Sequence, residues 1–140
     1  MIPKNLQLAA RMLIAPLFII PGLRKALAFG GTADSFARLG LPATELVVAL
    51  VILIEIGGGI ALIAGWRLRE VALGLATFTL ATAFIGHPFW SAEPAQLAGQ
   101  LNNFLKNLAI AGGFLLLAVD AGKTAKNGVE TGRTSTEPLR

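Results

Sequence analysis

Cysteine is absent from the 140 residues of the chain, and charged residues make up only 14% of them. The absence of cysteine excludes a disulfide scaffold, a thiolate metal site and any redox mechanism that depends on protein thiols. Soluble domains usually carry about a quarter of their residues as Asp, Glu, Lys and Arg. The shortage of charge therefore excludes an ordinary soluble domain.

Familiar motifs for phosphate binding, nucleophilic catalysis and metal binding are also absent. The glycines Gly57 to Gly59 lie inside an apolar run rather than between a strand and a helix, so they do not predict a phosphate-binding loop. No catalytic triad is recognisable. The single histidine, His87, is not enough for a convincing metal site, so we predict no metal site.

Long apolar segments account for most of the chain, of which 54% is hydrophobic. Four of them come close to the roughly 20 residues that a helix needs to cross about 30 Å of hydrocarbon. They span about 6–29, 43–66, 71–86 and 103–119. Pro16 and Pro21 predict a kink in the first segment. We therefore expect residues 1–121 to form an all-α integral membrane domain, a bundle of four transmembrane helices.

The remaining segments are polar or amphipathic. Segments 30–42 and 87–103 predict short interfacial helices in the first and third loops, with Trp90 suited to the headgroup boundary. Residues 122–140 are polar and lack periodicity, which predicts a disordered C-terminal tail. Small residues recur every four positions at Gly57, Ala61 and Gly65, which indicates a face for close helix packing.

The net charge of +4 does not indicate nucleic-acid binding, because the basic residues are scattered at segment ends rather than grouped with aromatics. With four spans, eight of the Lys and Arg residues lie on the side of the termini and four lie on the opposite side. By the positive-inside rule both termini are expected to be cytoplasmic. The partner that this pattern indicates is a lipid bilayer.

Glu55 lies roughly 18 Å along the second segment, near the middle of the bilayer. A carboxylate at that depth must be protonated, paired or facing a wet cavity. Gly58 and Gly59 follow on the next turn, and their missing side chains leave space beside Glu55 for a partner helix or a ligand.

Several polar groups are expected near Glu55 because the four spans alternate in direction. They come from the ends of the first, third and fourth spans, and they are Arg24, Lys25, His87, Lys106 and Asn107. Two interpretations remain open: a buried ion pair that only fixes helix register, and a functional pocket. Lys25 and Lys106 could also extend to the interface, and His87 could simply end a helix.

Four stretches together resemble the DoxX family of small bacterial inner-membrane proteins, in the family's order and spacing. They are FIIPGLRKALAF (18–29), GLP (40–42), EIGGGIALIAGWRLREVALGLATFTLATAFIGHPFW (55–90) and FLKNLAIAGGFLLLA (104–118). The resemblance implies a four-span bundle in the bacterial cytoplasmic membrane. It also marks as family motif positions Gly22, Lys25, Glu55, Gly58, His87, Lys106 and Asn107. Pro21 departs from the family, which commonly has a small residue before the glycine, so the local bend is expected to differ.

The family takes its name from a subunit of a terminal quinol oxidase, and its members are linked to thiosulfate oxidation with quinone as acceptor. The resemblance thus implies a quinone- or lipid-binding accessory subunit of a membrane redox system. In that role Glu55 would relay protons, and His87 or Lys106 would donate to a quinone carbonyl. The other ligand-binding candidates are Arg24, Lys25, Gly58, Gly59, Trp90 and Asn107.

Two other functions fit the same residues. A small transporter would bind a proton or cation at Glu55, near the midplane. A non-catalytic assembly module would use the polar cluster only to hold its shape or a partner. No haem ligand pair or flavin motif is visible, so a redox role would need electrons from a partner subunit. Intrinsic enzyme activity and homo-oligomerisation stay open.

Overall fold

The computed structural model describes the backbone of residues 2–134 and the side chains of residues 2–123. In this part of the chain there are six α-helices, one 3-10 turn and no strand. They are α1 (Lys4–Ile14), α2 (Pro16–Leu27), α3 (Phe29–Arg38), α4 (Thr44–Ala64), α5 (Leu68–Gly86), η1 (Phe89–Ser91) and α6 (Pro94–Thr134). Among the described residues four candidate membrane spans are present, over 4–27, 44–64, 68–91 and 94–123. The all-α membrane fold predicted from the sequence is confirmed.

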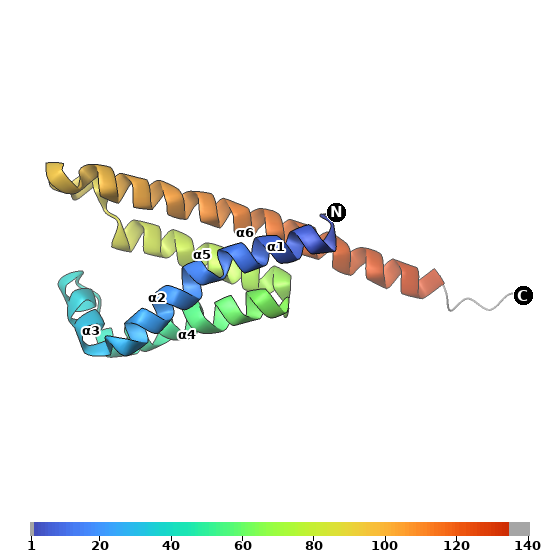
Figure 1. Ribbon diagram of the computed structural model, residues 1–140, viewed down its shortest axis with the longest axis horizontal. Helices are drawn as coiled ribbons and strands as arrows, with labels where there is room; N and C mark the ends of the chain where they lie inside the picture. The colour runs from blue at the N-terminus through green and yellow to red at the C-terminus, as the bar shows by residue number, and fades with distance from the viewer. Residues whose placement is uncertain (1, 135–140) are drawn as a thin grey trace, which may run out of the picture.

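The first span consists of two helices that meet at Ala15, directly before Pro16. Proline has no N–H to donate and its ring crowds the carbonyl one turn earlier, so the chain bends there. Pro21 lies inside α2 without interrupting it. Figure 1 shows the change of direction between α1 and α2, which turns α2 along α4.

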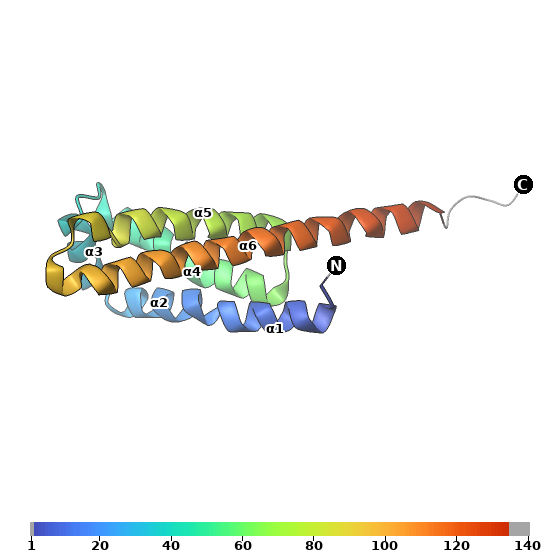
Figure 2. The ribbon, with the colours of Figure 1, turned by 90° about the horizontal axis from the view of Figure 1, so that it is seen from above.

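The spans form two tightly packed pairs, α2 with α4 and α5 with α6. Figures 1 and 2 show that α1 begins and α6 ends at one end of the bundle, here called the terminal end. At the opposite end, here called the loop end, lie α3 and the connection from α5 through η1 to α6. The two pairs meet near the terminal end and separate towards the loop end.

Glycines on α4 allow the neighbouring helices to approach closely. A Cβ added at Gly59 would lie 2.5 Å from Cγ1 of Ile19 on α2, and one at Gly58 would lie 2.8 Å from Cδ2 of Leu75 on α5. Gly57, by contrast, is exposed and would meet nothing within 4 Å. The packing face of α4 therefore runs through Gly58 and Gly59, not through the regular series that begins at Gly57. The helices on both sides of α4 determine which face is covered, and the spacing alone does not.

The main apolar core lies in the half of the bundle near the terminal end. Its fully buried side chains include Leu62 of α4 and Phe114 of α6, and Phe18 of α2 packs on Phe114 with 5.5 Å between ring centroids. At the terminal end the N-terminal residues contact α6, because Asp120 accepts hydrogen bonds from the Ile2 N–H and from Gln7 Nε2, both at 2.9 Å. This half is closed.

The C-terminal helix differs most from the expected boundaries. It starts at Pro94 rather than near Asn103, so the third loop keeps only η1 as a short helix. It continues to Thr134, inside the segment expected to be a disordered tail; residues 135–140 lie outside the described residues. Once a helix is formed, each added residue costs little, and no proline interrupts the sequence between Pro94 and Pro138.

Candidate functional site

The centre of the site is an ion pair between α2 and α4. Lys25 Nζ donates to both carboxylate oxygens of Glu55, at 2.8 and 2.9 Å. Glu55 is 7% exposed, and the Lys25 side chain is 25% exposed. The carboxylate that looked costly in the sequence is therefore paired across the helix interface, which is one of the arrangements that make an ionisable group tolerable in lipid.

Gly22 makes this pairing sterically feasible. A Cβ added at Gly22 would lie 2.8 Å from Ile56 Cγ1 and 3.0 Å from Glu55 Cβ. The backbone of α2 thus rests directly on the turn of α4 that carries Glu55. One turn of helix later, Lys25 stands on the same face of α2 and reaches the carboxylate.

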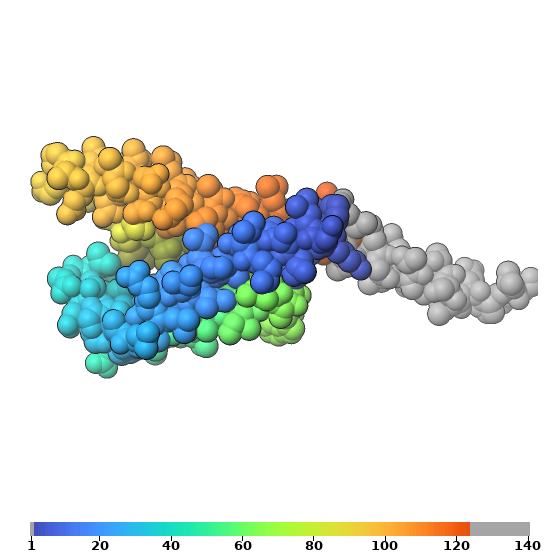
Figure 3. Space-filling model, viewed as in Figure 1, coloured from blue at the N-terminus to red at the C-terminus, as the bar shows by residue number. Residues whose placement is uncertain are grey.

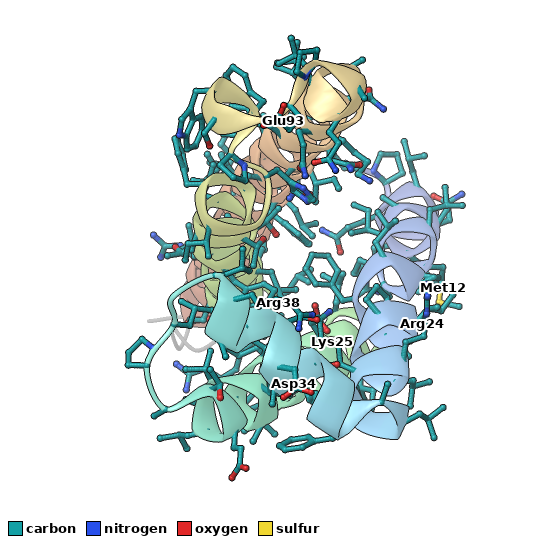
Figure 4. The ribbon with its side chains drawn as sticks, turned by 90° about the vertical axis from the view of Figure 1, so that its left-hand side faces the viewer. Met12, Arg24, Lys25, Asp34, Arg38 and Glu93 are labelled. Atoms are coloured by element: carbon teal, nitrogen blue, oxygen red, sulfur yellow. The ribbon has the colours of Figure 1, made fainter. Side chains whose placement is uncertain are left out.

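Beside the ion pair is a cavity of about 480 Å³ between the two helix pairs. It is open towards the loop end, where Figure 3 shows the surface hollowed between α3 and the α5 and α6 pair. In Figure 4 Lys25 points into the space that the helices enclose. Seven polar residues contribute to the cavity wall: Lys25, Glu55, Thr79, Thr82, His87, Lys106 and Asn107.

The rest of the cavity wall is apolar. Phe18 and Phe78 line its inner end, 6.5 Å apart between ring centroids, and both also pack on the apolar core that contains Phe114. Phe36 of α3 and Leu39, which directly follows that helix, cover the opposite side near the loop end. A mostly apolar cavity with a few convergent polar groups is the usual form of a small-molecule site.

Hydrogen bonds to neighbouring amides hold two of the polar groups at the rim. His87 Nδ1 lies 3.0 Å from Gln100 Oε1, and Lys106 Nζ donates to Asn103 Oδ1 at 3.0 Å. Within the described residues Lys106 has no carboxylate partner. The cavity therefore carries one neutralised ion pair and one further cation, which favours a ligand with acceptor oxygens.

Five of the polar residues that the sequence analysis singled out lie together in the cavity wall: Lys25, Glu55, His87, Lys106 and Asn107. Gly58 and Gly59 form no part of that wall, because they pack against Leu75 and Ile19. The space beside Glu55 is thus filled by neighbouring helices on that side.

Arg24 and Trp90 also lie outside the cavity wall. Arg24 points away from the enclosed space (Figure 4) and lines a shallow groove with Ala28 and Thr32, which shares Pro21 and Lys25 with the cavity. Successive residues of a helix point about 100° apart, so Arg24 and Lys25 cannot both face the ion pair. Trp90 instead packs edge-on against Phe104, with 6.1 Å between ring centroids, in an aromatic group that joins η1 to α6.

Two kinds of lining residue were not identified as site candidates from the sequence. Thr79, which the sequence does not mark as a site residue, is 3% exposed and lines the cavity. Phe36, Leu39 and Leu41 lie in the segment 30–42, which predicts an interfacial helix, and they line the cavity. Their amphipathic spacing gives the helix, and only the packing of α3 on α4 shows what its apolar side contacts.

Comparison with known proteins shows which family the sequence is similar to. The DoxX family model matches residues 6–88. Inner membrane protein YphA of Escherichia coli (strain K12) is 37% identical over 114 residues, which cover 81% of this chain and 81% of that protein. Inner membrane protein YqjF of the same organism is 42% identical over 112 residues, which cover 80% of this chain and 81% of that protein. No solved structure matches this chain significantly.

Proposed function

Because the chain belongs to the DoxX family and is an inner-membrane protein, we propose that its cavity binds the head of a membrane quinone. In this proposal the protein serves as an accessory subunit of a quinone-linked redox system and obtains electrons from a partner subunit. The observation that carries the proposal is the cavity itself, with apolar walls and polar groups brought together from α2, α4, α5 and α6.

The residues present fit a quinone in size and in chemistry. A volume of about 480 Å³ falls within the roughly 300–1,000 Å³ of small-molecule sites. Phe18, Phe78 and Ile110 offer apolar contacts for a ring. Lys106 and Asn107 offer donors for carbonyl oxygens.

When bound, a quinone supplies two-electron, two-proton redox chemistry, and the chain has groups suited to handle the protons. Lys25 Nζ and Glu55 Oε1 are 2.8 Å apart, so a proton can be exchanged within the pair. The amide oxygen of Gln100 can only accept, so His87 donates to it through Nδ1 and its Nε2 is left to accept a proton.

Orientation in the membrane completes the proposal. The helix α1 begins and the helix α6 ends at the terminal end, and the excess of Lys and Arg that the sequence gives this side favours a cytoplasmic location. The cavity opens at the loop end, so it would face the outer leaflet. A quinone dissolved in the membrane would reach it from that side.

A transport function is less well supported. In the closed half, Leu62, Phe114 and Leu117 are packed with under a tenth of their surface exposed, and none of the three lines the cavity. Glu55 is also already bound to Lys25 through both oxygens, unlike a carboxylate kept free for a transported cation. An assembly module would need the ion pair but not the cavity.

Thermal unfolding in detergent with a short-chain benzoquinone tests the proposal. Quinone at 100 times its Kd should stabilise the protein by about 2.7 kcal/mol. Val51→Trp should abolish the shift, because Val51 lines the cavity and the indole would fill it. Leu53→Trp is the matched control on the same helix; Leu53 is 67% exposed, and its variant should respond as the wild type does.

Two results would contradict the proposal. The first is an equal shift in both tryptophan variants, which would place quinone outside the cavity. The second is no shift with quinone, together with proton-coupled uptake into proteoliposomes that Glu55→Gln removes; this would assign the protein to transport.

A further inference from the structure

Thr79 carries a hydroxyl that the fold leaves without a hydrogen bond. In the described part of the chain only two buried side-chain polar atoms lack a partner, and they are Thr79 Oγ1 and Arg11 Nε. Thr79 is 3% exposed, so bulk water does not satisfy the hydroxyl. A buried polar group without a partner costs free energy, so one in a native fold calls for an explanation.

The other threonines of α5 show that the helix itself could satisfy such a group. Thr77 Oγ1 donates to the Leu73 carbonyl at 3.0 Å, and Thr82 Oγ1 donates to the Thr79 carbonyl at 3.0 Å. Donation to a carbonyl three or four residues earlier is the ordinary arrangement for threonine in a helix. Thr79 is the exception, and it is also a residue of the cavity wall.

Thr79 lies at the inner end of the cavity. It directly follows Phe78, one of the aromatic residues at that end, and it is eight residues from His87, which corresponds to about 12 Å along the helix. Gly58 of α4 contacts Leu75 of α5. Because α4 and α5 are consecutive and antiparallel, one turn from this contact brings Thr79 to the level of Glu55.

We propose that Thr79 Oγ–H is a ligand contact that donates to a carbonyl oxygen at the leading end of the bound molecule. The inference rests on the proposed function and specifies the class of ligand: a ring head with an acceptor oxygen at its innermost position. A second acceptor on the opposite side of the ring would meet Lys106 or Asn107 nearer the rim. The head thus enters first, and the tail points towards the loop end.

This orientation separates quinones from ordinary lipids. A phospholipid would place its headgroup at the rim and an acyl chain at the inner end, and the Thr79 hydroxyl would then stay without a partner. A quinone places an acceptor oxygen where the unpartnered donor lies. Thr79 therefore determines which class of amphiphile binds.

Calorimetric titration in detergent tests the inference with two probes, a short-chain benzoquinone and the alkylbenzene that carries the same tail. Thr79→Val replaces the hydroxyl with a methyl group and should weaken benzoquinone binding about tenfold, the usual range for one lost hydrogen bond. Thr79→Ser keeps the hydroxyl and should bind as the wild type does. Thr77→Val, on the same helix but bonded to its own backbone, is the matched control and should also bind normally.

For the alkylbenzene the ratio of wild-type to Thr79→Val affinity should be near one, because it has no carbonyl oxygen to accept from Thr79. Unfolding of the ligand-free Thr79→Val protein should occur at the wild-type temperature or above it, since the variant loses an unpartnered hydroxyl. Equal benzoquinone affinity of the wild type and Thr79→Val would overturn this inference alone. A wild type that binds no benzoquinone would overturn the proposed function, and this inference with it.

Discussion

The two halves of the bundle are built from the same four spans, yet one is solid and the other hollow. Near the terminal end the core side chains are fully buried, among them Leu62, Ala72 and Phe114. Towards the loop end, the same helices leave a cavity of about 480 Å³ with Lys25 and Glu55 on its wall. The closed half holds the helices together through apolar packing and through the hydrogen bonds to Asp120, so the open half can hold a cavity with polar groups on its wall.

The two halves differ because the first span changes direction before Pro16. In the closed half α1 lies near α6, because Ile2 and Gln7 donate to Asp120. Beyond the bend, α2 follows α4 instead, and the glycines at Gly22 and Gly59 bring the two backbones together. Because α2 packs closely on α4, it stays apart from the α5 and α6 pair, and the cavity lies between them. The cavity is thus a consequence of packing between α2 and α4.

The largest loss of stability is expected from damage to the closed half. Phe114→Ala removes a fully buried ring that contacts Phe18. It should lower the free energy of unfolding by about 3 kcal/mol, the lower part of the range for such deletions, because in lipid only the packing contribution is lost. Leu116→Ala is the control on the same helix, 71% exposed, and should change little. Denaturation in mixed micelles measures both; equal losses would contradict a core confined to this half.

The ion pair of the open half should give the next effect. Lys25→Met leaves Glu55 buried without its partner and should cost about 2 kcal/mol, less than a fully buried pair because part of Lys25 is exposed. The double variant Lys25→Met with Glu55→Gln should recover most of that loss, since neither charge remains. Chemical denaturation of the single and double variants checks this. A double variant as unstable as the sum of the two single variants would mean that the groups do not interact.

The glycines of α4 offer a sharper test of where the helices touch. Gly59→Ala puts a Cβ against Ile19 and the Ala15 carbonyl, so it should destabilise the bundle by about 1–2 kcal/mol, as overpacking does. Gly57→Ala adds a methyl group in open space and should leave stability unchanged or slightly higher. Thermal unfolding of the two variants compares them directly. Destabilisation by Gly57→Ala alone would show that the packing face had been assigned to the wrong side of α4.

The smallest effect is expected at the link between the N-terminal residues and α6. Asp120→Ala removes the acceptors for the Ile2 N–H and for Gln7 Nε2. Hydrogen exchange should become faster over residues 2–7 while exchange in α4 and α5 stays as in the wild type, because the core beneath is unaffected. Faster exchange throughout the bundle would contradict a purely local role for this contact.

Much of the fold follows from the sequence, because a long apolar segment in lipid can satisfy its own backbone hydrogen bonds only as a helix. The kink before Pro16 and the position of Glu55 in the second span were also predictable. The ends of the helices were less predictable. The helix α6 begins at Pro94, where the amphipathic sequence predicted a separate interfacial segment. Continuing a helix costs less than stopping and restarting one.

The composition of the site was predictable only in part. Alternating spans bring Lys25, Glu55 and Lys106 to one region, and the sequence predicts that. Rotation of each helix about its axis decides which neighbour faces inward, and this follows from packing. For that reason Arg24, next to Lys25, points away, while Thr79 faces the cavity.

The most direct test of the account is a crystal structure with a benzoquinone that carries bromine at the end of a short alkyl tail. We expect an anomalous bromine peak near the loop-end opening, with ring density between Glu55, Thr79 and Lys106. A bromine peak on the outer surface of the bundle, or at the inner end beside Phe78 with the ring at the rim, would contradict it.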